Sequence, residues 1–174
     1  MSEPGPPARI ASFAPIVDGA STILILGSMP SVTSLARGQY YGHPRNQFWA
    51  ILEAVYDEPV GAAPVGAEYE ARVAYLLRKR LALWDTLASC ERVGSADSEI
   101  RDPVPNAVAA LLATHPGIRR ILLNGQAAAG YYRRLIAPQV SGAYECVTLP
   151  SSSPLNTAPL EEKVAQWGKA LRGG

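Results

Sequence analysis

Short aliphatic runs alternate with amphipathic segments along this chain, and this alternation predicts the fold class. Four runs are continuously apolar, which is the pattern of strands buried on both faces of a parallel sheet. They are residues 22–27, 81–85, 121–124 and 144–149. The second run continues directly from a helix-like segment, so its start is the least sharply marked.

Apolar residues at helical spacing mark the segments between and after these runs. The stripes are Phe48/Trp49/Leu52/Val55/Tyr56, Tyr69/Val73/Leu76/Leu77, Val108/Leu111/Leu112, Ala128/Tyr131/Tyr132/Leu135 and Leu160/Val164/Trp167/Leu171. Pro44 and Pro105 stand where a proline fits the first turn of a helix. Strands and helices in alternation predict an α/β fold, a three-layer α/β/α sandwich around a central four-stranded parallel sheet.

The length and the lack of repeats or linkers predict a single domain over residues 1–174. Residues 1–13 are rich in proline and are expected to be flexible. A monomer is the default expectation for such a chain.

Composition narrows the possible partners. Apolar residues make up 48% and charged residues 18%, and the net charge is +1, so any contact with nucleic acid must use a local face. The only cysteines, Cys90 and Cys146, lie far apart, which argues against a metal site and favours a reduced, cytoplasmic setting. The chain shows no leader and no membrane-spanning run, so no membrane partner is expected.

Polar segments follow each predicted strand. They are residues 27–31, Asp85, residues 124–125 and residues 150–156. The carboxyl ends of parallel strands share one edge of a sheet, and open α/β sheets bind ligands there. We therefore expect these segments to form one crevice.

The segment at 39–49 is unusually dense in aromatic and polar residues. It carries two tyrosines, a histidine, an arginine and an asparagine at the start of a predicted helix. Aromatic rings stack on bases and amides read their edges, so the composition suits a nucleobase pocket. The alternative places Trp49 and Phe48 in the core and Tyr40 on the surface. His43 fits either a contact to phosphate or base, or a helix cap, whereas His115 fits a surface cap.

Four motifs together resemble one enzyme family. They are GSMPS at 27–31, YYGHPRNQFW at 40–49, LWDTLASCERVGSADSEIRD at 83–102 and LPSSSPLN at 149–156. In this order they look like the hypoxanthine-DNA glycosylase family, or DNA-deoxyinosine glycosylases, of the uracil-DNA glycosylase superfamily. The similarity runs from about residue 23 to residue 167. It implies the superfamily's α/β/α fold and hydrolysis of N-glycosidic bonds in DNA, with no metal or organic cofactor.

The resemblance also implies roles for single residues. In the superfamily, an Asp or Asn after the first strand activates water, and a histidine in the last loop stabilises the departing base. The matching positions here are Met29 and Ser151. In the hypoxanthine branch the asparagine of HPRNQFW compensates, so Asn46 and Ser151 are the expected catalytic residues. Leu155 keeps the apolar residue that wedges into the duplex.

Asp85 lies near the position where relatives hold a base-recognising asparagine. A buried carboxylate there could accept a hydrogen bond from N1–H of hypoxanthine, a group that unprotonated adenine lacks. A cap on a following helix is the open alternative. The full set of expected base contacts is Ser28, Met29, Tyr40, Tyr41, Phe48, Asp85 and Asn124. The expected DNA contacts are Pro30, Ser31, His43, Arg45, Ser152, Ser153, Leu155 and Asn156.

The expected function is excision of deaminated bases from DNA in base excision repair, hypoxanthine above all, with uracil and xanthine as further candidates. The product is an abasic site, since no lysine is indicated as a Schiff-base nucleophile. Two alternatives stay open. Met29 and Ser151 also fit a damage-binding module without efficient turnover, and the open sheet fits a nucleoside hydrolase. Leu155 favours a DNA substrate, because an apolar wedge has little use on a nucleoside.

Overall fold

Four parallel strands form the central sheet, in the order β3-β2-β6-β7. Their bounds, in a computed structural model that describes residues 8–60 and 66–173, are β2 (Ile23–Gly27), β3 (Leu81–Asp85), β6 (Arg120–Asn124) and β7 (Glu145–Leu149). Each matches one predicted run to within one residue. The predicted α/β class and the four-stranded parallel sheet are confirmed.

The strands differ in how far they are buried. The two inner strands, β2 and β6, are almost wholly buried, because neighbouring strands and helices cover both their edges and both their faces. The prediction that all four runs are buried on both faces is wrong for β7. This strand lies at the edge of the sheet, and Glu145, Cys146 and Thr148 are exposed there. An edge strand has a neighbour on one side only, so its side chains retain contact with water.

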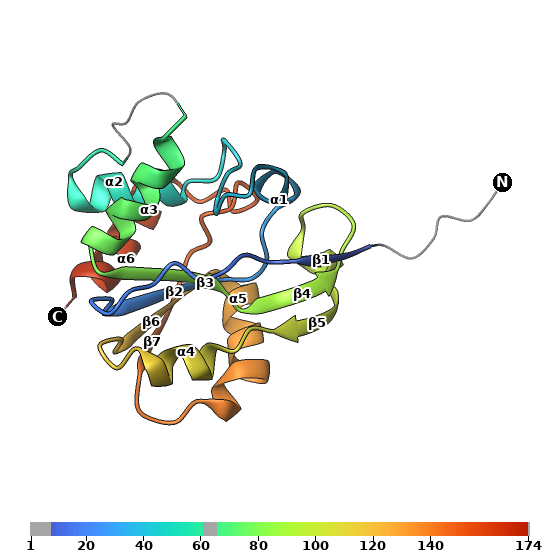
Figure 1. Cartoon of the computed structure of the whole chain (residues 1–174). Coiled ribbons are helices and arrows are strands. Elements are labelled where there is room, and N and C mark those ends of the chain that lie inside the picture. Colours follow the sequence, from blue (N-terminus) through green and yellow to red (C-terminus); the bar gives the residue numbers. More distant parts are fainter. Residues whose placement is uncertain (1–7, 61–65, 174) are drawn as a thin grey trace.

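Six α-helices lie within the described residues, and five of them pack on the two faces of this sheet, which makes the three layers visible in Figure 1. The helices are α1 (Val32–Arg37), α2 (Phe48–Tyr56), α3 (Glu68–Arg78), α4 (Val108–Thr114), α5 (Gln126–Tyr131) and α6 (Leu160–Arg172). Helices α2, α3 and α6 cover one face, and α4 and α5 cover the other. Alternate residues of β2 explain this, since Ile25 faces the first group whereas Leu24 and Leu26 face the second.

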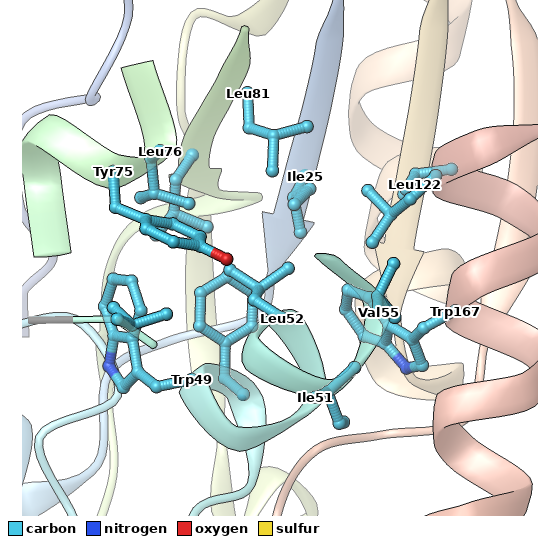
Figure 2. Packing of buried hydrophobic residues seen from close by; sticks show 14 of the residues in the cluster. Ile25, Trp49, Ile51, Leu52, Val55, Tyr75, Leu76, Leu81, Leu122 and Trp167 are labelled. Atoms are coloured by element: carbon cyan, nitrogen blue, oxygen red, sulfur yellow. The ribbon is translucent and has the colours of Figure 1, made fainter. Parts of the chain in front are cut away.

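The larger core lies under α2, α3 and α6 (Figure 2). Trp167 of α6 is fully buried, and its indole N–H donates to Pro150 O at 2.9 Å. Phe48 of α2 packs edge-on against both Trp49 and Trp167. A large aromatic side chain buried in this way contributes about 2–3 kcal/mol through its apolar area. The core thus fixes α2 and α6, the two helices that flank the loops of the strand-end crevice.

A second, antiparallel sheet extends the molecule beside the first. Its strands are β1 (Arg9–Ala11), β4 (Leu87–Glu91) and β5 (Arg101–Pro105), in the order β1-β4-β5. The 3-10 turn η1 (Asp97–Glu99) lies in the connection from β4 to β5. In Figure 1 this connection rises next to α1. No pattern in the sequence had predicted this sheet.

The second sheet corrects two expectations. Residues 9–11 of the expected flexible start form β1, which pairs with β4, while residues 1–7 lie outside the described part of the chain. Pro105 does not open a helix, because it ends β5 and α4 starts at Val108. Pro44 likewise lies ahead of α2, which starts at Phe48. In both cases the loop before the helix is longer than the proline position suggested.

Candidate active site at the strand ends

A cavity of about 360 Å³ lies at the carboxyl ends of the parallel strands. This volume falls within the range of sites that hold small molecules and bases. The segments that follow β2, β3, β6 and β7 all line it, as the crevice prediction required. Every residue expected to contact base or DNA lines the cavity, except Phe48 and Asn156.

Asp85 lies at the floor of the cavity. It ends β3, its side chain is only 4% exposed, and its Oδ2 atom has no hydrogen-bond partner within the described residues. Burial, and next the charge of Asp97, raise the pKa of this carboxyl group to about 7, and Arg92 opposes the shift. Strand β4, not a helix, follows Asp85, so the alternative that it caps a helix is excluded.

Gly27 makes room for this carboxyl group. A Cβ atom on Gly27 would lie 2.6 Å from Asp85 Oδ1 and 2.9 Å from Tyr41 Oη. Both distances are shorter than real Cβ contacts, so any other residue at the end of β2 would force these side chains or the strand to shift. The close approach of backbone to Asp85 and Tyr41 therefore depends on this residue.

Tyr41 forms the aromatic wall. Its ring stacks on Phe48 with centroids 4.1 Å apart, and its backbone is left-handed, with φ of 52°. Burial, and next the charge of Asp85, raise the pKa of its hydroxyl group far above the ordinary value, so the hydroxyl keeps its proton. Tyr41 Oη accepts a hydrogen bond from Asn124 Nδ2 at 3.0 Å.

Asn124 is held entirely by the protein. Its Nδ2 group donates to Tyr41 Oη and to Ser152 Oγ, and its Oδ1 accepts from Ser152 N at 2.9 Å. Both amide hydrogens are therefore used, and Asn124 positions Tyr41 and Ser152 instead of donating to a base. Ser152 is buried by the same contacts, which corrects its expected role as a surface contact to DNA.

Asn46 lines the cavity with a side-chain amide of which only the oxygen has a hydrogen-bond partner within the described residues. Its Oδ1 accepts from Phe48 N at 3.0 Å in the turn that leads into α2, whereas no bond of its Nδ2 group is seen within the described residues. His43 Nδ1 accepts from Arg45 N at 3.1 Å. A backbone N–H can only donate, so the neutral ring carries its proton on Nε2. Asn46 and His43 thus present N–H donors at the cavity, and Arg45 is exposed at its rim.

The loop after β7 presents Leu155 to solvent. Ser151 Oγ accepts from Ser153 N at 3.1 Å, and Ser153 Oγ accepts from Leu155 N at 3.2 Å. These two turns leave Leu155 75% exposed. Asn156 Nδ2 donates to Ser151 O, so Asn156 stabilises the loop from behind and does not line the cavity.

The turn after β2 is also more structural than expected. Pro30 is buried, and its carbonyl oxygen accepts from Arg92 Nη2 at 2.6 Å. Ser31 Oγ accepts from Ser34 N and caps α1. Ser28 and Met29 remain in the cavity wall, with Ser28 Oγ donating to Asp97 Oδ1 at 2.7 Å. Pro30 and Ser31 thus shape the turn.

The comparisons with known proteins agree with this arrangement. Residues 14–172 match the model of the uracil DNA glycosylase superfamily. The chain belongs to this superfamily. Two curated relatives named hypoxanthine DNA glycosylase, from Methanosarcina barkeri and Methanosarcina acetivorans, are 33% and 34% identical over 160 residues. Each alignment covers 92% of this chain and 96% of the relative.

A solved structure has the same fold. It is a solution NMR structure of a Methanosarcina acetivorans protein provisionally assigned as a uracil DNA glycosylase. It is 33% identical, superposes with a TM-score of 0.79, and the match covers 95% of this chain and 98% of that one. The predicted family is confirmed, and this superfamily member is a DNA glycosylase by activity class.

Two aromatic residues of the glycosylase lie deeper than expected. Phe48 is fully buried, stacks on Tyr41 and does not line the cavity, so it is not placed to contact a base directly. Tyr40 lines the cavity but is buried, not exposed, and its hydroxyl donates to Ala14 O at 2.7 Å.

The sequence reasoning missed Ser95, Ala96 and Asp97, which line the cavity from the β4–β5 connection. Arg92 ties this connection to the turn after β2 through Pro30 O, and Ser95 Oγ accepts from Val32 N at 2.9 Å. Their segment was part of a recognised motif, but without the antiparallel sheet nothing placed it near the strand ends. No helix in the described residues is long and apolar enough to cross a membrane.

Proposed function

We propose that this glycosylase removes hypoxanthine from DNA by hydrolysing the N-glycosidic bond and leaves an abasic site. The observation that carries the proposal is the buried, unpartnered carboxyl group of Asp85 at the floor of a cavity of base-binding size. The names of the two curated relatives support the choice of base. Such an enzyme works on the chromosome, and hence in the cytoplasm of a prokaryote.

Asp85 can distinguish hypoxanthine from adenine. Hypoxanthine carries a hydrogen on N1, whereas unprotonated adenine presents a lone pair there. An ionised carboxyl group can only accept, so Asp85 pairs with the first base and repels the second. With a pKa of about 7, a substantial fraction of Asp85 is ionised at neutral pH. Xanthine and uracil also carry ring N–H groups, so they belong in the substrate panel.

The base would enter beside Tyr41. The stack on Phe48 fixes one face of the Tyr41 ring, and the hydrogen bond from Asn124 fixes its hydroxyl. A wall held in this way needs no reordering when a base is flipped into the cavity. Leu155 would fill the gap left in the duplex, because it is the exposed apolar residue at the cavity rim.

Bond cleavage would rely on positioning the water and the departing base, and not on a strong general acid. The C1′–N9 bond breaks with its electron pair moving to the base, and C1′ gains oxocarbenium character. In this proposal the Nδ2 group of Asn46 holds the attacking water, and the Ser151 hydroxyl stabilises the departing base. Lysine is absent from the described lining of the cavity, so the proposal includes no strand-cleaving lyase step.

The test is a single-turnover assay on otherwise identical duplexes containing hypoxanthine, uracil or xanthine, followed by alkaline cleavage of abasic sites. We expect strand scission with hypoxanthine, and a loss of at least about 100-fold in Asn46→Ala. Val104→Ala, an exposed substitution outside the cavity, is the matched control. Binding of the hypoxanthine duplex without scission would overturn the proposal in favour of a damage-binding module. Release of base from free inosine but not from DNA would favour a nucleoside hydrolase.

A further inference from the structure

Asp97 is the second carboxyl group that lines the cavity. Asp85 is buried at the floor, whereas Asp97 is exposed in η1. Asp97 also lines a second hollow of about 660 Å³ that shares Ser151, Ser153 and Leu155 with the cavity. It therefore stands at the mouth, beside the residues that are proposed to meet the DNA.

The side chain of Asp97 is held in place without being neutralised. Ser28 Oγ donates to Oδ1 at 2.7 Å, which links η1 to the turn after β2. None of the ion pairs found in the described residues involves Asp97. The nearby guanidinium of Arg92 donates instead to Pro30 O and Gly94 O. Its second oxygen, Oδ2, has no hydrogen bond within the described residues.

Three other acceptor atoms at the cavity already accept a hydrogen bond from the backbone. Asn46 Oδ1 accepts from Phe48 N, His43 Nδ1 accepts from Arg45 N, and Asn124 Oδ1 accepts from Ser152 N. Asp85 remains, but its place at the floor suits the N1 edge of the base. In a purine, the N1 edge and the glycosidic bond lie at opposite ends. A base read by Asp85 therefore places its sugar toward the mouth, where Asp97 lies.

We propose that Asp97 is a catalytic residue, whose carboxylate accepts a proton from the attacking water and stabilises the positive charge on C1′. This inference rests on the proposed function. As the C1′–N9 bond breaks, its electron pair leaves with the base, and the water oxygen forms the new bond to C1′. One water proton passes to Asp97 Oδ2 and then to solvent, and the departing base takes a proton from solvent. General-base assistance of this kind contributes about 100-fold or more.

Asp97→Asn separates this role from a structural one. The amide oxygen of Asn can still accept from Ser28 Oγ, so the link to the turn is kept while the charge and the base are lost. We expect the single-turnover rate on the hypoxanthine duplex to fall about 100-fold. Affinity for a duplex with a tetrahydrofuran abasic analogue should stay equal or rise, because a carboxylate no longer faces phosphates. Glu99→Gln removes a charge from the same turn outside the cavity and should keep the wild-type rate.

Rescue of the excision rate by a small anion distinguishes a catalytic role of Asp97 from a purely structural one. Asp97→Ala should regain part of its rate in sodium formate, compared with sodium chloride at the same ionic strength, because a small carboxylate replaces the lost one. If Asp97→Asn excises hypoxanthine at the wild-type rate, the role of Asp97 is overturned and the proposed function stands. If the wild-type enzyme excises no base, both proposals fail.

Discussion

The side-chain amide of Asn124 donates a hydrogen bond of 3.0 Å to the hydroxyl oxygen of Tyr41. This bond occupies one lone pair of Tyr41 Oη and leaves the hydroxyl proton free to turn elsewhere. Burial raises the pKa of Tyr41, so the proton is retained. Tyr41 Oη and Asp85 Oδ1 both lie beside Gly27 at the floor of the cavity. The hydroxyl proton of Tyr41 is therefore available there as a hydrogen-bond donor. Tyr41 therefore combines an aromatic wall with a hydrogen-bond donor.

Tyr41→Phe should separate these two contributions. The ring keeps its stack on Phe48, but the donor is lost and Asn124 Nδ2 loses an acceptor. A lost hydrogen bond of about 1–2 kcal/mol predicts a fall in kcat/KM for hypoxanthine of roughly 5- to 30-fold. Tyr131→Phe, which alters a tyrosine outside the cavity lining, is the control. Equal rates for Tyr41→Phe and the wild type would show that the hydroxyl has no part in base binding.

Asp85→Asn should stabilise the fold at alkaline pH. The unfolded carboxyl group ionises near 3.8, whereas the folded one ionises at about 7. The folded state therefore binds this proton more tightly, and Asp85 lowers the free energy of unfolding as the pH rises between those values. Removing the charge should add on the order of 2–4 kcal/mol at pH 8 and much less at pH 4. Urea unfolding at both pH values checks this, with exposed Asp102→Asn as the control.

The same variant should lose the pH dependence of hypoxanthine excision. If the ionised Asp85 accepts N1–H, excision by the wild type increases as the pH rises through about 7 and then levels off. Asp85→Asn should be slower and should lack this increase. Single-turnover rates from pH 5.5 to 8.5 give the comparison. A wild-type rate that instead decreases through this range would contradict the assigned role, because the protonated acid would then be the active form.

Gly27→Ala should close the cavity floor. The added methyl group would lie 2.6 Å from Asp85 Oδ1, so the carboxyl group or strand β2 must shift. Overpacking of this kind costs about 1–3 kcal/mol of stability, and we expect the excision rate to fall below detection. Gly130→Ala meets no atom closer than 3.9 Å and should be active. Thermal melting and the hypoxanthine assay test both, and an active Gly27→Ala would refute the close contact.

Leu155→Ala should impair duplex substrates more than single strands. Leu155 is 75% exposed, so its loss leaves the fold intact, but a flipped base in a duplex loses the group that fills its place. We expect a rate about 10-fold lower on the hypoxanthine duplex and little change on the single strand. Parallel assays on both substrates measure the ratio. The same loss on both would argue against a wedge.

The hydrophobic pattern alone predicted the central sheet, because the burial of a strand can be inferred from its own few residues. A continuous aliphatic run such as residues 22–27 has few stable places other than a sheet covered on both faces. The direction of parallel strands then brings their carboxyl ends to one edge. Asp85, Asn124 and the loop at Ser151 were therefore predictable as neighbours, although they are far apart in the chain.

Long-range contacts settle which polar groups at this edge already have hydrogen-bond partners. Asn124 and Ser152 look like ligands in the sequence, yet each satisfies the other, because a buried polar group must find a partner. Asp97 looks like an ordinary turn residue until the antiparallel sheet brings η1 against Ser28. Hydrogen-bond occupancy depends on contacts between distant segments, which local patterns do not encode. Local patterns therefore predict the sheet and its strand-end edge, whereas long-range contacts single out Asp85, Tyr41 and Asp97 as the groups that we propose to act there.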